Sequence, residues 1–519
     1  MQSIALTTTR RHLPRWSWRS RAFGSSTWSP TADVEAEASG PLKGYVVLDL
    51  GQVVAGNMCA ALLGYFGASV IKVEPPQKGD PLRHLRDLDP TGTSLWWRTY
   101  GRNRQCMTAD LRTDAGRDII RRMAQSGSVD VILENFRPGV MESWGLGPDD
   151  LPDHIVFSRI SGYGQTGPKS SLPGYASVCE AASGFRSVNG YPDRPSVRPN
   201  ISLGDSLAGL HAAFGVVMSL LERQKSGRGQ VIDTALTESM FNMLEGVLPE
   251  YIASGKTKVR SMSGSSISQV VPSGVWRSKD NHYVVRIDCL DRSLSLLSLR
   301  SLLSLLSHYP HSRCTVRAPL VRQVIGANGN SVYDRLVTLM NRPDMKSDSA
   351  PRFASDATRV DAEGEINAVI EEYVSSLDAE EVIKNLEDAR VPAGMIMTIE
   401  DVRTMDGWIG RSIRGRDPAS SRAPEPSTLR RLPHPLSPAL SRPSIRPTQI
   451  YADEHWQSRD MWEELDGVTV PKLVPKLSRT PGKTTSLGRS LGADTDEILK
   501  TRLGMSDADI AELRNAGVI

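Results

Sequence analysis

Short apolar runs alternate with amphipathic stretches along most of the chain after residue 40. Residues 45–50 and 69–74 are apolar runs of strand length, and residues 58–66 between them have helical spacing that ends at Gly67. A strand, a helix and a strand within about 30 residues predict a βαβ unit, in which the strands are parallel and the crossover is right-handed.

The same alternation continues after this first unit. Helical spacing recurs at 114–125, and apolar runs of strand length follow at 129–134 and 155–160. Strands and helices that alternate in this way predict an α/β, Rossmann-like domain over about residues 40–250.

Helices are also expected in the second half of the chain. One includes residues 333–336, and residues 362–386 are charged and rich in helical sequence. Residues 507–515 predict an amphipathic helix that is capped by Gly517.

Two stretches do not fit this pattern. Residues 289–323 contain Leu-Ser repeats followed by Arg-rich sequence, and residues 409–448 contain eight prolines and eight arginines. Such low-complexity sequence does not form a packed core. We interpret both stretches as insertions, either translated introns or disordered loops.

The N-terminus has a different composition from the rest. Residues 1–32 contain five arginines, many Ser and Thr residues, and no Asp or Glu. This composition is typical of a mitochondrial transit peptide, and the alternative is a disordered tail. Without this leader, 57 of the 62 basic residues remain against 59 acidic ones. That balance does not suggest a nucleic-acid surface.

The sharpest local motif is Leu203-Gly204-Asp205-Ser206, which opens a long apolar helix at 207–221. Gly204 permits a tight turn, and Asp205 then lies in the first helical turn. Free N–H groups and the helix dipole there are expected to keep its carboxylate ionised. An ionised carboxylate that faces a cleft can attack an activated acyl group. The alternative is that Asp205 only caps the helix.

Other candidate segments give weaker evidence of a functional role than Asp205 does. Residues 162–168 form a glycine-rich loop after a strand, and residues 225–230 form a basic helix end with a glycine cap that leads into a strand at 231–233. His211 lies among apolar residues and is expected to be a packed core histidine.

Residue spacing along the chain argues against disulfides, a metal site and a membrane span. The five cysteines show no C-x-x-C spacing, which fits a reducing compartment without disulfides or a zinc site. Asp205, Glu134 and His211 lack metal-ligand spacing, so no metal is expected. No run of about 18 apolar residues is present, so no membrane span is expected either.

A series of short motifs runs through residues 40–288, 324–408 and 450–519. The motifs, in chain order, are Val47–Leu50, Val54–Gly56, Gly67–Pro76, Gly79–Pro81, Glu134–Gly139, Trp144–Gly147, Ser161–Pro168, Gly204–Asp205, Lys225–Gln230 and Val391–Gly394. Any one of them is weak alone, but their shared order and spacing resemble the family III CoA-transferases, also called the CaiB/BaiF family.

The resemblance implies a two-domain, ring-like chain that interlocks with a second copy as a homodimer. The large Rossmann-like domain would span 40–250. A smaller α+β domain would span 251–408, interrupted by the insertion at 289–323. After the insertion at 409–448, the segment 449–519 would return to the large domain.

The resemblance also assigns a mechanism to Asp205. In the family this aspartate attacks an acyl-CoA thioester and forms an aspartyl anhydride, which CoA thiolate converts into an aspartyl-CoA thioester. An acceptor carboxylic acid then reverses the steps. No permanent cofactor is implied, because the CoA thioester is a substrate. The implied CoA contacts are Val54, Ala55, Asn135, Phe136, Pro173, Gly174, Tyr175 and Ala176.

Some positions depart from the formyl-CoA transferase pattern. Val54 stands where that enzyme has glutamine, and Gln52 where it has histidine; Ser143 replaces a common arginine, and residues 493–495 replace a Glu-His-Thr signature. Formyl-CoA is therefore not the expected donor. The chain more closely resembles the mitochondrial succinate–hydroxymethylglutarate type of this family, and that resemblance implies a pair of dicarboxylates.

Two alternatives remain open at this point. The same fold hosts α-methylacyl-CoA racemases, which need a histidine partner for the aspartate. Here that position is Tyr175, whose ordinary pKa near 10 suits a base poorly at neutral pH. The other alternative is an inactive CoA-binding relic, because the first insertion interrupts the small domain.

Overall fold

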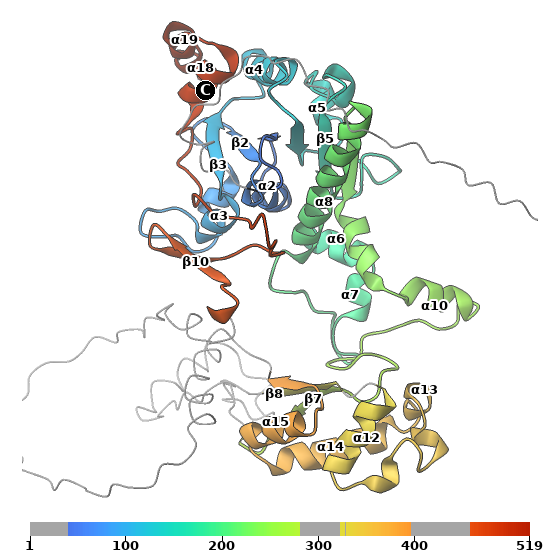
Figure 1. Ribbon diagram of the computed structural model, residues 1–519. Helices are drawn as coiled ribbons and strands as arrows, with labels where there is room; N and C mark the ends of the chain where they lie inside the picture. The colour runs from blue at the N-terminus through green and yellow to red at the C-terminus, as the bar shows by residue number, and fades with distance from the viewer. Residues whose placement is uncertain (1–39, 281–321, 327–328, 396–456) are drawn as a thin grey trace, which may run out of the picture.

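The computed structural model describes residues 40–280, 322–326, 329–395 and 457–519 (Figure 1). The expected transit peptide and the second expected insertion lie outside the described residues, as does all but the end of the first insertion.

A six-stranded parallel sheet forms the centre of the large domain, with the strand order β3-β2-β1-β4-β5-β6. Every residue of β1 and β4 is buried, which explains why these strands appear in the sequence as continuous apolar runs. The α/β prediction is therefore confirmed. The strands are β1 (Val46–Asp49), β2 (Ser69–Glu74), β3 (Arg104–Thr108), β4 (Val131–Glu134), β5 (Val156–Ser161) and β6 (Val231–Ala235).

Helices cover both faces of this sheet (Figure 1). Val47 packs on the face covered by α2 (Ala55–Tyr65) and α8 (Leu203–Ser226). Its neighbour Leu48 packs on the other face, with α4 (Asp114–Gln125) and the two C-terminal helices. Successive residues of a strand point to opposite faces, so one short strand contributes to both cores.

Some of the expected elements differ from the observed ones. The helix expected at 58–66 begins three residues earlier, at Ala55, and the helix expected from 207 begins at Leu203 and continues to Ser226. The expected glycine cap of α8 is confirmed, because Gly227 has a φ of 75°. β3 was not predicted, since its first two residues, Arg104 and Gln105, are polar.

Shorter elements connect these parts. Before β4 they are η1 (Pro81–His84) and α3 (Leu95–Tyr100). After β4 they are α5 (Val140–Ser143), η2 (Pro148–Asp150), α6 (Ala176–Ala182), α7 (Phe185–Val188), α9 (Leu236–Phe241), η3 (Asn242–Leu244) and α10 (Val247–Ala253).

A second group of elements has a hydrophobic core of its own, which includes Tyr333, Leu336 and Ile370. Its sheet is antiparallel, in the order β7-β8-β9, and Figure 1 shows it with its helices apart from the large sheet. The elements are β7 (Ser273–Arg277), β8 (Arg322–Gly326), α12 (Asn330–Leu339), η4 (Pro343–Met345), η5 (Pro351–Phe353), α13 (Asp356–Arg359), α14 (Glu363–Ser376), α15 (Ala379–Asp388) and β9 (Ala393–Met395).

The C-terminal segment packs along the edge strand β3. It contains a hairpin of β10 (Trp462–Leu465) and β11 (Val468–Pro471), then α18 (Thr495–Leu503) and α19 (Asp507–Asn515). The Cys106 N–H donates to the Asp494 carboxylate at 2.7 Å, and the Asp110 N–H donates to the Val518 carbonyl at 2.7 Å.

α8 is long and apolar enough to cross a membrane by length and composition alone. A core helix passes the same test, and α8 packs against α2 and β5 with Ala208, Ala212 and Val216 buried.

Candidate active site

Asp205 is the third residue of α8 and is half-buried. The N-cap of this helix is Ser202, so the alternative that Asp205 is merely the cap is wrong. Gly204 lies inside the helix, and a Cβ there would make ordinary contacts with Ala176 at 3.5 Å. The expected tight turn at Gly204 is therefore also wrong.

The electrostatic surroundings of Asp205 differ from the expectation. Burial raises its pKa to about 6, and the negative charge of Glu180 adds to this rise, while Arg198 opposes it. Desolvation and a neighbouring carboxylate therefore oppose the ionised form that the helix N-terminus was expected to favour. The group still ionises at neutral pH.

A glycine brings the N-terminus of α2 close to Asp205. Gly209 lies one turn after Asp205 on the same face of α8. A Cβ on Gly209 would lie 2.7 Å from the Ala55 carbonyl oxygen and 2.8 Å from the Met58 Cβ, so only glycine allows the two helices to approach this closely. Val54 and Ala55 are thereby placed next to the carboxylate.

A second close approach shapes the loop after β5. A Cβ on Gly162 or on Gly174 would lie 2.7 Å from the Cα of the other. The chain therefore folds back on itself, and residues 173–175 come beside the start of α8. Ala176 is the first residue of α6, is buried, and packs against Gly204.

These segments enclose a pocket of about 230 Å³. It lies at the carboxyl ends of β1, β4, β5 and β6, beside the β1–β4 pair, where the strand order reverses and open α/β sheets bind ligands. The described residues that line it are Gln52, Val53, Val54, Ala55, Asn135, Phe136, Arg137, Pro138, Ile160, Ser161, Gly162, Ser170, Leu172, Pro173, Gly174, Tyr175, Asp205 and Leu236.

The structure brings almost all of the expected site residues to this one pocket. Only Ala176 lies behind the wall rather than in it. Sequence reasoning did not single out Arg137 or Leu236, each of which lies just beyond the carboxyl end of a strand. Their positions after β4 and β6 could have identified them, because open α/β sheets bind ligands at the carboxyl ends of their strands.

Comparison with known proteins gives the family of this chain. The sequence model described as "CoA-transferase family III" matches residues 42–293 and 318–432. The chain belongs to CoA-transferase family III. It is therefore an enzyme that acts on CoA thioesters and carboxylic acids. The matched ranges omit 294–317 and include 409–432, and the interpretation of the two insertions stays a prediction.

Two relatives support this membership. The chain is 32% identical to a succinyl-CoA–D-citramalate CoA-transferase of Chloroflexus aurantiacus, over 92% of this chain and 98% of that protein. It is also 32% identical to the human succinyl-CoA:glutarate CoA-transferase, over 51% of this chain and 60% of that protein. These relatives do not favour the racemase or relic alternatives.

A solved structure shares the fold. A CaiB/BaiF family protein from Brucella suis superposes with a TM-score of 0.64 and 23% identity, over 89% of this chain and all of that chain. The mixed α/β architecture with its parallel sheet is therefore that of this family.

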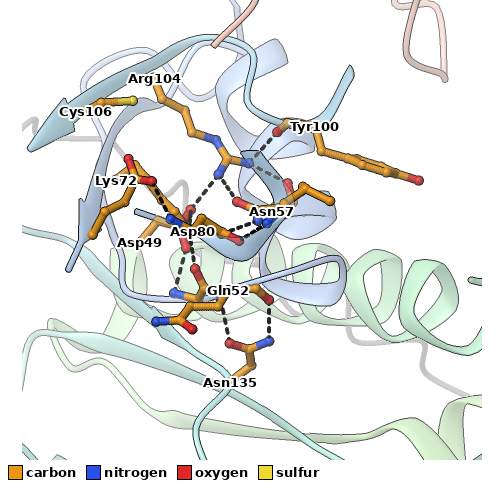
Figure 2. Close-up of polar contacts among 12 residues, drawn as sticks. Asp49, Gln52, Asn57, Lys72, Asp80, Tyr100, Arg104, Cys106 and Asn135 are labelled. Atoms are coloured by element: carbon orange, nitrogen blue, oxygen red, sulfur yellow. Dashed lines mark hydrogen bonds and ion pairs between the residues drawn. The ribbon is translucent and has the colours of Figure 1, made fainter. Parts of the chain in front are cut away.

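Specific contacts fix the two pocket residues that follow β4. The Asn135 amide donates to the Gln52 carbonyl at 2.8 Å and accepts from the Gln52 N–H at 2.7 Å, as Figure 2 shows. The Phe136 N–H donates to the Glu134 carboxylate at 2.7 Å, and its ring packs edge-on against Trp144.

Glu134 is held just behind the pocket wall. Burial raises the pKa of Glu134 to about 7, although Arg159 lies 2.7 Å away and opposes the rise. Among the residues that the structure describes, no group of three His, Cys, Asp or Glu side chains is placed to hold a metal ion.

Proposed function

We propose that this family III CoA-transferase moves CoA between dicarboxylic acids through covalent intermediates on Asp205. The observation that carries the proposal is the composition of the pocket. Among the described residues that line it, Asp205 is the only acid, and none is Cys, His or Lys. The carboxylate of Asp205 is thus the strongest nucleophile in the wall at neutral pH.

The proposed reaction runs through two covalent states of Asp205. The carboxylate attacks the thioester carbonyl carbon, the C–S bond breaks, and CoA leaves as a thiolate from an aspartyl anhydride. The thiolate attacks the aspartyl carbonyl, the C–O bond breaks, and the first acid leaves as a carboxylate. The acceptor carboxylate then attacks the aspartyl-CoA thioester, and the same two steps run in reverse.

The dicarboxylate part of the proposal rests on two observations. Both relatives described above carry succinyl-CoA in their names. Arg137 lines the pocket and is exposed, so it provides a positive charge for a second carboxylate or for the phosphates of CoA.

Mass spectrometry of the enzyme incubated with succinyl-CoA and glutarate tests this proposal. We expect an Asp205 adduct whose added mass is that of CoA less one water, and the appearance of glutaryl-CoA. Exchange of the α-proton with solvent, without transfer, would indicate racemase activity, and neither product would indicate a relic. The role of Asp205 would be refuted if the Asp205→Asn or Asp205→Ala variant had the same kcat as the unaltered enzyme.

We also propose that two copies of the chain interlock, each as a ring-like chain. Four large apolar side chains lie at helical spacing along α8 and are 48–64% exposed: Leu210, Phe214, Met218 and Leu221. An apolar stripe of this length is typical of a protein interface. Light scattering should give a dimer mass, and Phe214→Glu should produce monomers, whereas a monomeric unaltered protein would refute the proposal.

Mitochondrial localisation is the last part of the proposal, and it rests on the Arg-rich, acid-free composition of residues 1–32. A fusion of residues 1–40 to a fluorescent protein should enter mitochondria. Replacement of the five arginines by glutamine should abolish import, and an unchanged distribution would refute the proposal.

A further inference from the structure

The turn of residues 51–53, which joins β1 to α2, has an unfavourable backbone conformation. Val53 has a φ of 61°, in the left-handed region that a β-branched residue rarely adopts. The next two residues, Val54 and Ala55, lie in the wall of the pocket beside Asp205. A conformation of this kind persists only where the surroundings hold it.

Side chains bind every peptide group of the 51–53 turn. The three N–H groups donate, in chain order, to Asp49 Oδ1 at 2.9 Å, Asn135 Oδ1 at 2.7 Å and Asp80 Oδ1 at 3.0 Å. The three carbonyl oxygens accept, in the same order, from Lys72 Nζ, Asn135 Nδ2 at 2.8 Å and Asn57 Nδ2 at 2.6 Å. Figure 2 shows these groups converging on the turn.

Four of these six bonds come from Asp49, Asn57, Lys72 and Asp80, and Asn135 makes the other two. The first four side chains and Arg104, which contacts Asp49, form a buried network that we call the clamp. Lys72 lies 3.0 Å from Asp80 and 3.6 Å from Asp49, and Arg104 lies 2.8 Å from Asp49. All four charged side chains are fully buried, two of each sign. Burial raises the pKa of Asp80, but the charge of Lys72 and several hydrogen bonds outweigh it, so the net shift is downward.

Stability alone does not account for the clamp. Two buried carboxylates and two buried cations lose their hydration, and well-packed apolar side chains would often serve a fold as well or better. Apolar side chains cannot bind the three N–H and three C=O groups of an unfavourable turn, whereas the clamp binds four of them and Asn135 binds the other two. The geometry therefore points to a role in placing the turn.

We propose that Asp80 and Lys72 are positioning residues of the transferase reaction, which hold the 51–53 turn so that Val54 and Ala55 present the N-terminus of α2 to the CoA thioester. This inference rests on the proposed function. α2 has no side-chain cap at its N-terminus, so the clamp, rather than a cap, determines how this end of the helix faces the pocket.

Asp80→Asn is the sharpest change to the clamp. Asp80 Oδ2 accepts from both Asn57 Nδ2, at 2.7 Å, and Lys72 Nζ. In Asp80→Asn, an amide NH₂ would face the donors Asn57 Nδ2 and Lys72 Nζ, and donors do not bind each other. We therefore expect the clamp to open, although the side chain at position 80 keeps its volume. Val53→Gly is the matching rescue, because glycine adopts positive φ without help.

The experiment measures CoA affinity by calorimetry, and kcat and KM, for Asp80→Asn, Val53→Gly and the double variant. We expect Asp80→Asn to weaken CoA binding and lower kcat/KM at least tenfold. The double variant should recover most of both relative to Val53→Gly alone, which is the reference for the comparison because residue 53 itself lines the pocket. Arg102→Gln is the matched control, because it removes a buried charge that does not touch the turn.

Unchanged CoA affinity in folded Asp80→Asn, or a double variant that recovers nothing, would overturn the inference. Should Asp80→Asn fail to fold, Asn57→Ala opens the same clamp without stranding a charge, and the same outcomes apply to it. CoA binding does not require the chemistry at Asp205. Full turnover by Asp205→Ala would therefore refute the proposed function while leaving this measurement valid.

Discussion

The pKa of Asp205 links the nucleophile to the pH at which the enzyme works. Burial and Glu180 raise this pKa to about 6. Below that pH the Asp205 carboxylate is mostly protonated and is a poor nucleophile. Above that pH the nucleophilic anion predominates. We expect kcat/KM to fall about tenfold per pH unit below pH 6 and to level off above pH 7. A profile that stays flat down to pH 4 would contradict an Asp205 nucleophile with this pKa.

Glu180 offers a direct way to move that pH limit. It is fully buried beside the first turn of α8, and its charge disfavours a second negative charge on Asp205. Glu180→Gln should lower the pKa of Asp205 and shift the acid limb of the profile to lower pH. Asp193→Asn is the matched control, because that carboxylate is exposed and paired with Arg194. A shift toward higher pH in Glu180→Gln would contradict the argument.

The site residues show which details a sequence can reveal. The motif order directed attention to Asn135, Phe136 and Asp205, and these residues do lie in one pocket. The rise in the pKa of Asp205 was not predictable, because it depends first on burial and then on Glu180. Glu180 is 25 residues away in the chain, and the packing of α6 against α8 places it beside Asp205. Ala176 was expected in the pocket wall, but it is the first residue of α6 and is buried behind that wall.

At the scale of the elements, the contact of α2 with α8 places the pocket wall. Gly209→Ala adds a Cβ 2.7 Å from the Ala55 carbonyl oxygen, so the helices must separate. We expect a loss of about 1–3 kcal/mol of unfolding free energy, together with a lower kcat/KM. Gly364→Ala in α14 is the control, because a Cβ there meets nothing within 4 Å, and it should stabilise by up to about 1 kcal/mol. Equal effects of the two substitutions on denaturant unfolding would refute the packing argument.

Elements with a strong periodic pattern were predictable, and elements defined by their neighbours were not. β1, β2, β4 and β5 are apolar runs, and α4 has the helical spacing of its sequence. β3 lacks such a run, because it is an edge strand whose first residue, Arg104, serves the buried clamp. The antiparallel sheet of the second core joins strands from three distant segments, and no local pattern records such pairing.

At the scale of the whole molecule, the C-terminal segment completes a core that begins near residue 46. Ile498 and Leu499 of α18 are buried with Ile120 and Met123 of α4, on the face of the sheet opposite to α2 and α8. Ile498→Ala should therefore lower the unfolding free energy by about 2–5 kcal/mol, because it leaves a cavity in this core. In the pocket wall, Ala55, Ile160 and Leu236 belong to the core on the other face, and Phe136 borders this one. The KM for succinyl-CoA and kcat, measured below the unfolding temperature, should therefore change much less than the stability. A change in KM without a loss of stability would show that the two faces of the sheet are coupled, and that the C-terminal segment acts on the site as well as on the fold.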